Sequence, residues 1–203
     1  MNRVALIVDN PLRDLPGLVL LGTRLCQEGI TCFLVPVNLQ SSEIWALAPD
    51  FVLLNYLRPN NEQLVRQLIE AKIQFGVLDT EGGVAESFES FEGNLIRDVT
   101  IRHQSAFICS WGPRLAQHAI GAGWYLDSQM VVTGTPRLDF YSHPWRTVAL
   151  ETSKYANEYD HQLILVNGNF TLANPGFLSP EAEVEMYVHT FNRDRDMVLQ
   201  SQQ

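Results

Sequence analysis

The sequence predicts an α/β fold in which helices cover a doubly wound, parallel sheet of six strands. Six short apolar runs with little polar alternation predict the strands, because strands that are covered on both faces have this composition. The runs occupy residues 4–8, 31–37, 51–56, 73–78, 106–110 and 130–133. Helical segments separate the runs, and this alternation indicates βαβ crossovers between parallel strands.

Three helical segments have ends that the sequence defines. Residues 17–28 carry leucines at helical spacing and are followed by Gly29, which favours a left-handed helix end. Residues 60–72 carry an apolar stripe, and residues 113–121 open on a proline, which suits a first helical turn. Residues 81–103 break the alternation. They predict a long loop with one short helix, beyond the carboxyl end of the fourth strand.

The sequence further predicts one whole domain, residues 1–145, and the opening of a second, residues 146–203. A new apolar run at residues 163–166 predicts the first strand of that second domain, and too little chain follows to complete it. Residues 179–190 predict a helix whose first turn Ser179 can cap. The polar residues 194–203 are expected to be frayed.

Composition limits the classes of function. The 203 residues carry 14 Lys and Arg against 23 Asp and Glu, a net charge of −9, which argues against nucleic-acid binding. The apolar runs are too short for a membrane span or a signal sequence. The three cysteines form no CxxC pair, which indicates buried thiols in the cytoplasm rather than a metal or redox site. The histidines have no ligand spacing, so no metal or cofactor is expected.

The first candidate site lies directly after the fourth predicted strand, where Asp79, Glu81, Gly82 and Gly83 follow one another. Open α/β sheets bind ligands at the carboxyl ends of their strands. A carboxylate there can act as a general base when burial and a neighbouring charge raise its pKa. The alternative is a helix cap or turn, in which the glycines supply positive φ.

The loop after the first predicted strand holds Asp9, Asn10 and Arg13. Many α/β proteins bind an anion here, at the amino end of the following helix. The loop has neither GxGxxG nor a Walker lysine, so it does not match a dinucleotide or P-loop site. Arg13 could hold a carboxylate or phosphate in a bidentate fork, or could lie on the surface beside Asp14.

Two further candidates follow the fifth and sixth predicted strands. Trp111 is expected to be an exposed aromatic side chain at the same edge of the sheet. Arg137 lies in a sharp Gly-x-Pro turn and could pair with Asp139. Arg137 is either a clamp at a hinge between domains or a direct contact to a ligand phosphate or carboxylate.

These motifs occur in a fixed order, and the ordered set resembles the surface carbohydrate (surface polysaccharide) biosynthesis protein family. The motifs are Asp79-x-Glu81-Gly82-Gly83, Trp111-Gly112, Gly134-x-Pro136-Arg137-x-Asp139 and Asn167-x-Asn169-Phe170. The resemblance covers residues 4–176 and implies a GT-B glycosyltransferase build, related to CDP-glycerol glycerophosphotransferases and UDP-sugar 2-epimerases. The sequence departs from the family pattern at Thr80 and Gly168, and it lacks the complete second domain of family members. The chain alone is therefore expected to have little or no transferase activity.

The resemblance implies transfer of a sugar from a nucleotide-sugar donor to a glycan acceptor. Asp79 or Glu81 would deprotonate or orient the acceptor hydroxyl, and Arg13 and Arg137 would hold acidic groups. The remaining substrate-binding candidates are Asp9, Asn10, Gly82, Gly83, Trp111 and Asn169.

Two other functional hypotheses stay open. The chain could be a non-catalytic remnant or split subunit that binds a glycan or a partner chain, or that associates with itself. A phospho-acceptor receiver domain is a third and weaker hypothesis, because a lysine after the fifth strand is missing. The expected location is the cytoplasm, with the inner face of the membrane as a second possibility.

Overall fold

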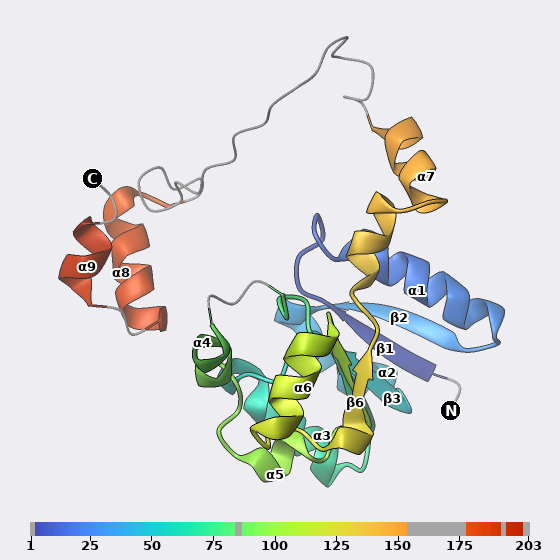
Figure 1. The fold of residues 1–203 in the computed structure, drawn as a ribbon, viewed down its shortest axis with the longest axis horizontal. Coiled ribbons are helices and arrows are strands. Elements are labelled where there is room, and N and C mark those ends of the chain that lie inside the picture. Colours follow the sequence, from blue (N-terminus) through green and yellow to red (C-terminus); the bar gives the residue numbers. More distant parts are fainter. Residues whose placement is uncertain (1–2, 84–86, 154–177, 192–193, 201–203) are drawn as a thin grey trace. The chain divides into compact units, whose positions relative to one another are not determined.

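The computed structural model describes residues 3–83, 87–153, 178–191 and 194–200 (Figure 1). The chain divides into two compact units, Met1–Ser153 and Lys154–Gln203, which are described separately. The first unit holds the sheet. Its strands are β1 (Arg3–Val8), β2 (Thr31–Pro36), β3 (Phe51–Leu54), β4 (Gln74–Leu78), β5 (Ile108–Ser110) and β6 (Met130–Val132).

All six strands are parallel, in the order β2-β1-β3-β4-β5-β6, which confirms the predicted fold class. The helices of this unit connect consecutive strands or follow β6. They are α1 (Leu15–Gln27), α2 (Gln40–Leu47), α3 (Glu62–Glu70), α4 (Phe88–Gly93), α5 (Val99–Arg102), α6 (Pro113–Gly121) and α7 (Trp145–Thr152). Short 3-10 helices occur at η1 (Val37–Leu39), η2 (Pro59–Asn61), η3 (Asp127–Gln129) and η4 (Pro136–Tyr141).

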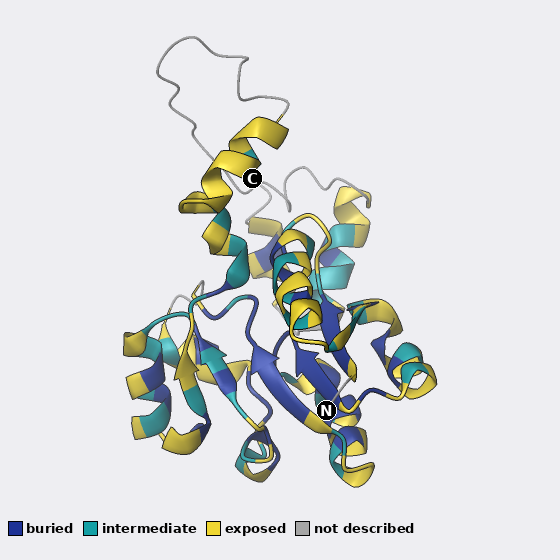
Figure 2. Cartoon of the chain, turned by 90° about the vertical axis from the view of Figure 1, so that its right-hand side faces the viewer, coloured by how far each residue is buried: buried dark blue, intermediate teal, exposed yellow. Residues whose placement is uncertain are grey.

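The direction of each crossover decides which face of the sheet a helix covers. The connection from β1 to β2 steps one way along the sheet, and the next four step the other way. Because such crossovers are right-handed, α1 packs on one face, against Leu6 and Leu53, and α2 to α6 pack on the other, against Val52 and Phe75 (Figure 1). Figure 2 shows the result as buried strands beneath helices whose outer surfaces are exposed.

One helix of this unit was not predicted, and one prediction about the unit is wrong. The crossover from β2 to β3 contains α2, which the sequence did not indicate because the helix has only eight residues and buries only Gln40 and Ile44. The segment after β4 contains two short helices, α4 and α5, rather than one. Each begins at a capping side chain, since Ser87 accepts the amide of Ser90 at 3.1 Å and Asp98 accepts that of Thr100 at 3.0 Å.

In the second unit the structure describes α8 (Pro180–Phe191) and α9 (Arg195–Gln200). The predicted helix is confirmed with its cap, because Ser179 Oγ accepts the amide of Ala182 at 3.2 Å. The expectation of a frayed end is wrong for α9, since Asp194 caps that helix and Val198 is buried. The predicted strand at 163–166 and Asn169 lie outside the described residues, so the identity of this unit stays a prediction.

Candidate functional site

The candidate site lies at the carboxyl edge of the sheet, where the loops after β1, β3, β4, β5 and β6 meet. Parallel strands joined by crossovers of one hand end at one edge, so residues far apart in sequence come together there. A side-chain network joins these loops. Its members are Asp9, Arg13, Asp14, Arg58, Asp79, Glu81, Trp111 and Arg137.

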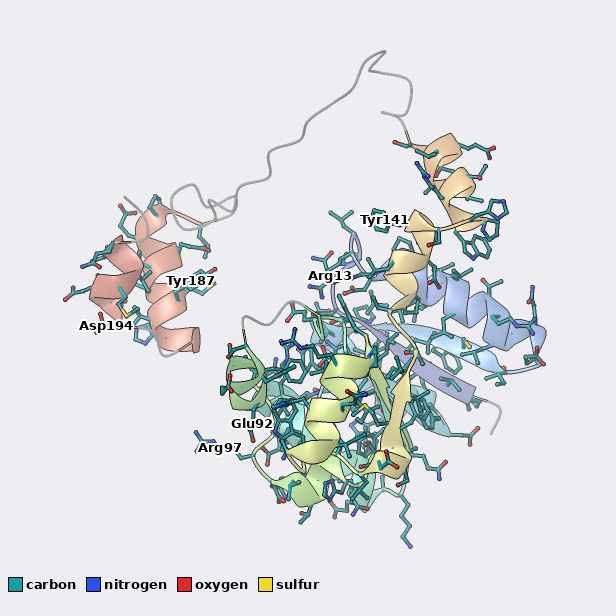
Figure 3. The ribbon with its side chains drawn as sticks, in the orientation of Figure 1. Arg13, Glu92, Arg97, Tyr141, Tyr187 and Asp194 are labelled. Carbon is teal, nitrogen blue, oxygen red and sulfur yellow. The ribbon has the colours of Figure 1, made fainter. Side chains whose placement is uncertain are left out.

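Arg13 is at the centre of this network, on the loop that follows β1 (Figure 3). Asn10 holds the loop in shape, because its Oδ1 accepts the amides of Leu12 and Arg13 at 2.9 and 3.0 Å. The guanidinium of Arg13 donates to Asp14 from Nε at 2.9 Å, to Asp9 from Nη2 at 2.7 Å and to Glu81 from Nη1 at 3.0 Å. The hydrogen bonds to Asp14 are the main reason why the pKa of Arg13 is raised above its ordinary value.

This pairing changes the expected role of Arg13. All three nitrogens of its guanidinium donate to carboxylates of the chain itself, so the side chain has little capacity left for a ligand anion. The arginine instead binds the loop after β1 to the loop after β4.

Arg58, which the sequence analysis did not single out, makes the second link to Glu81. Its Nη1 donates to Glu81 Oε2 at 2.7 Å, and its Nη2 lies 3.8 Å from Asp79 Oδ1. The guanidinium also lies 4.8 Å from the ring centre of Tyr56. The position of Arg58 in the loop after the third strand could have indicated its role, because the other candidates were chosen by that criterion.

The two carboxylates after β4 have opposite electrostatic environments. Asp79 is 7% exposed, and burial raises its pKa to about 6, against the lowering effects of the Glu81 amide and Arg58. Burial also acts to raise the pKa of Glu81, but the hydrogen bonds and charges of Arg58 and Arg13 outweigh it and leave the pKa below its usual value. A pair whose pKa values are pushed apart in this way suits acid–base chemistry, with Asp79 exchanging the proton and Glu81 remaining ionised.

Trp111 fixes the backbone beneath these carboxylates. Its Nε1 donates to the carbonyl oxygen of Asp79 at 2.6 Å. The ring packs directly on the glycines that follow Glu81: a Cβ on Gly83 would lie 2.1 Å from Trp111 Cε3, and one on Gly82 would lie 3.1 Å from Cδ1. The side chain is half-buried, so the expectation of an exposed aromatic is wrong.

Arg137 lies over Trp111, with its guanidinium carbon 4.8 Å from the ring centre. The ion pair that it makes is with Asp14, at 3.6 Å, rather than the pair with Asp139 that the sequence suggested. The approach of α1 to η4 explains this pairing. A Cβ on Gly17 would lie 2.7 Å from the backbone nitrogen of Arg137, so only glycine lets the helix come this close.

A cavity of about 530 Å³ opens beside the network. That volume falls within the range of small-molecule sites. It is lined by Gly82, Gly83, Ser87, Phe88, Glu89, Phe91, Trp111, Gly112, Arg114 and Leu115. Gly82 and Gly83 follow Glu81 in sequence, so the cavity borders the loop that carries the two carboxylates, although neither carboxylate side chain lines it.

The structure therefore brings together the predicted site residues that come before β6 in the sequence. It also links them to Arg137, which follows β6, through Asp14 and Trp111. In the described ranges, no group of His, Cys, Asp and Glu side chains could hold a metal ion. Nor does any described helix have the length and apolar character needed to cross a membrane.

Comparison with known proteins gives similarity at the level of the fold. No protein-family model matches the chain. No curated protein sequence matches it either. S. aureus MnaA, solved with UDP, superposes with a TM-score of 0.51 at 13% identity, over 70% of this chain and 47% of MnaA. A Listeria monocytogenes protein provisionally assigned as a UDP-N-acetylglucosamine 2-epimerase gives 0.52 at 14% identity, over 86% of this chain and 50% of the other.

The chain thus spans about half the length of these two solved structures. At such low identities, the superpositions establish a shared Rossmann-like α/β fold. The superpositions carry no information about the carboxylate network, which is described from the residues of this chain.

Proposed function

We propose that this chain performs acid–base chemistry on a nucleotide-activated sugar, in the transfer of the sugar to a glycan acceptor during surface polysaccharide assembly. The observation that carries the proposal is Asp79: a carboxyl group at the end of a buried strand, with a pKa of about 6, beside a carboxylate that two arginines keep ionised. Support for a nucleotide sugar comes from the fold that the chain shares with a protein solved with UDP.

In the proposed reaction, Asp79 accepts the proton of the acceptor hydroxyl. One oxygen of Asp79, Oδ1, already accepts the amide of Glu81 at 2.9 Å, which fixes the orientation of the carboxyl group. The acceptor oxygen then forms a bond to the anomeric carbon of the sugar, and the bond from that carbon to the nucleoside diphosphate breaks. A base placed in this way typically contributes a factor of about 10²–10⁴ to the rate.

Arg13 and Arg58 would keep Glu81 ionised, while Asp79, whose pKa is about 6, takes up and releases the proton. Arg13 donates to three carboxylates, and Arg58 donates to one and lies 3.8 Å from a second, so the charges of both arginines are balanced by carboxylates of the chain. The side of the substrate that enters this site is therefore the uncharged, hydroxyl-bearing side. This revises the expectation that Arg13 holds an acidic group of the ligand.

The experiment that tests the proposal compares Asp79→Asn with Asp127→Asn. Asp127 is an exposed aspartate in η3, just before β6 and so at the opposite edge of the sheet. The assay measures the release of UDP from UDP-sugars by the 203-residue chain in the presence of a glycan acceptor. Asp79→Asn should lower this rate at least about 100-fold, while Asp127→Asn should leave it unchanged.

The same assay, followed by proton NMR in deuterated water, separates transfer from epimerisation. If deuterium is incorporated at C2 of the sugar in the absence of an acceptor, the chain catalyses the epimerase chemistry assigned to the Listeria protein, and the proposal of sugar transfer is wrong. Equal rates for wild type and Asp79→Asn would show that Asp79 is not the base.

A second candidate function is binding without turnover, either of a glycan or of a partner chain. The occupied donors of Arg13 favour it, because they make the network a stable structural link. Exposed apolar side chains on η4 and α7, Leu138, Tyr141, Val148 and Leu150, offer a surface for self-association. Saturable glycan binding in a calorimeter, without UDP release, would favour this function. Light scattering would measure the association.

A further inference from the structure

Two cysteines that the sequence analysis treated as buried thiols lie next to each other at the far end of α1 from the network. Cys26 is in the last turn of α1 and is exposed, and Cys32 is the second residue of β2 and is half-buried. β2 is the edge strand of the sheet, so solvent reaches this pair from the side. The expectation of buried thiols is wrong for Cys26.

The backbone brings the pair together. Gly22 and Cys26 are four residues apart and so share one side of α1. A Cβ on Gly22 would lie 3.8 Å from the Cβ of Cys32, within the separation of about 3.5–4.5 Å that a disulfide spans. At Gly22, one helical turn before Cys26, α1 therefore lies at disulfide spacing from Cys32 of β2.

The chain reverses immediately after Cys26. The amide of Gly29 donates to the Cys26 carbonyl at 3.0 Å, and Gly29 itself has a φ of +79°. β2 then begins at Thr31. This tight turn keeps the end of α1 against the start of β2, so that Cys26 and Cys32 lie on either side of the turn.

The two thiols also interact. Burial, and after it the neighbouring Cys26 thiol, raise the pKa of Cys32 to about 11. Cys32 is therefore protonated at neutral pH, whereas Cys26 is exposed to solvent. An oxidant in solution would reach Cys26 first, and Cys32 would be placed to react with the product.

We propose that Cys26 and Cys32 form a reversible intrachain disulfide, a covalent modification site at the edge of the sheet that responds to hydroperoxides. The Cys26 thiolate attacks the hydroperoxide, whose O–O bond breaks, giving Cys26 sulfenic acid and an alcohol or water. The Cys32 sulfur then bonds to the Cys26 sulfur, and the hydroxyl group leaves as water with the Cys32 proton. The proposal is independent of the proposed function, because the pair lies outside the carboxylate network.

Peptide mapping of the full chain tests the proposal. Residues 25–57 contain no Lys or Arg, so trypsin leaves both cysteines in one peptide. Glu28 lies between them, and cleavage after it separates Cys26 from Cys32 unless a disulfide holds the fragments together. The oxidant is hydrogen peroxide, at a protein concentration low enough to keep chains apart.

We expect the fragments to stay linked after peroxide and to separate after dithiothreitol, with free thiols falling from three to one. Cys26→Ser and Cys32→Ser should each abolish the link, and Cys109→Ser should retain it. Separate fragments after peroxide would overturn the proposal, as would a disulfide only between two chains or over-oxidised Cys26 beside an intact Cys32 thiol.

Discussion

The indole nitrogen of Trp111 donates to the backbone carbonyl of Asp79 at 2.6 Å, and this bond joins the loops after β4 and β5. It attaches the aromatic ring to the residue that we propose as the base. Since the ring also packs on Gly83 and lies beneath Arg137, one side chain determines where three loops of the site lie. The first two predictions concern this contact.

Gly83→Ala should displace the loop after β4. The new Cβ would lie 2.1 Å from Trp111 Cε3, a separation that requires the ring or the backbone to move. Overpacking of this kind costs about 1–3 kcal/mol of unfolding free energy. Thermal denaturation followed by circular dichroism measures the loss. Gly93→Ala is the matched control, because a Cβ there meets nothing within 4 Å and α4 should be unchanged or slightly stabilised. Equal melting temperatures for the two variants would contradict the prediction.

Trp111→Phe should keep an aromatic ring but remove the donor to Asp79. The carbonyl oxygen of Asp79 would lose this partner, and a polar group left unsatisfied in the interior costs about 1–3 kcal/mol. Urea denaturation gives the change in unfolding free energy. Trp145→Phe is the comparison, since Trp145 is 38% exposed on α7. A smaller loss at position 111 than at 145 would show that the hydrogen bond contributes little.

Asp79→Asn should change how stability depends on pH. The folded pKa of Asp79, about 6, is higher than its unfolded value, so the favourable contribution of the protonated group is complete at low pH and is lost as pH rises through about 6. Asparagine has no such dependence. The unfolding free energy of the variant, relative to that of the wild type, should therefore increase by roughly 1 kcal/mol between about pH 5 and about pH 8. Urea titrations at several pH values test this, and a constant difference would exclude a raised pKa.

The rate of sugar transfer should also depend on the ionisation of Asp79, but it should rise with pH where the stability of the fold falls. As a base, Asp79 acts only when ionised, so kcat/KM for sugar transfer should rise with pH and level off above about 6. A rate that falls through this pH range would assign Asp79 as an acid instead.

Arg13→Gln should destabilise the first unit by about 2 kcal/mol, a value reduced from that of a buried pair because Arg13 is partly exposed. The physical reason is the buried carboxylate of Asp14, which keeps the Asn10 amide at 3.1 Å but, as a cationic partner, only the more distant Arg137 at 3.6 Å. The pKa of Glu81 should also rise, because a hydrogen bond and a positive charge are removed. Carboxyl NMR titration reports the second effect. Arg66→Gln, in an exposed pair with Glu62, should change stability by less than about 0.5 kcal/mol.

The sheet could be predicted from the sequence because each strand is a local apolar run. Strands buried on both faces need continuous apolar residues, so all six runs and their parallel direction were recognisable before the structure. The short helices α2, α4 and α5 lack a long apolar stripe. Their positions depend on crossover geometry and capping rather than on composition.

The sequence by itself also determined the edge of the sheet at which Asp79, Glu81, Arg13 and Trp111 meet, since one-handed crossovers bring all strand ends to that edge. Only the tertiary structure decided how these side chains pair. The choice of Asp14 over Asp139 for Arg137, and of Glu81 for Arg58, depends on helix α1 approaching η4 at Gly17 and on distances across the sheet. Ion pairs form between residues that are close in space, and sequence spacing carries no information about distances set by the packing of separate elements.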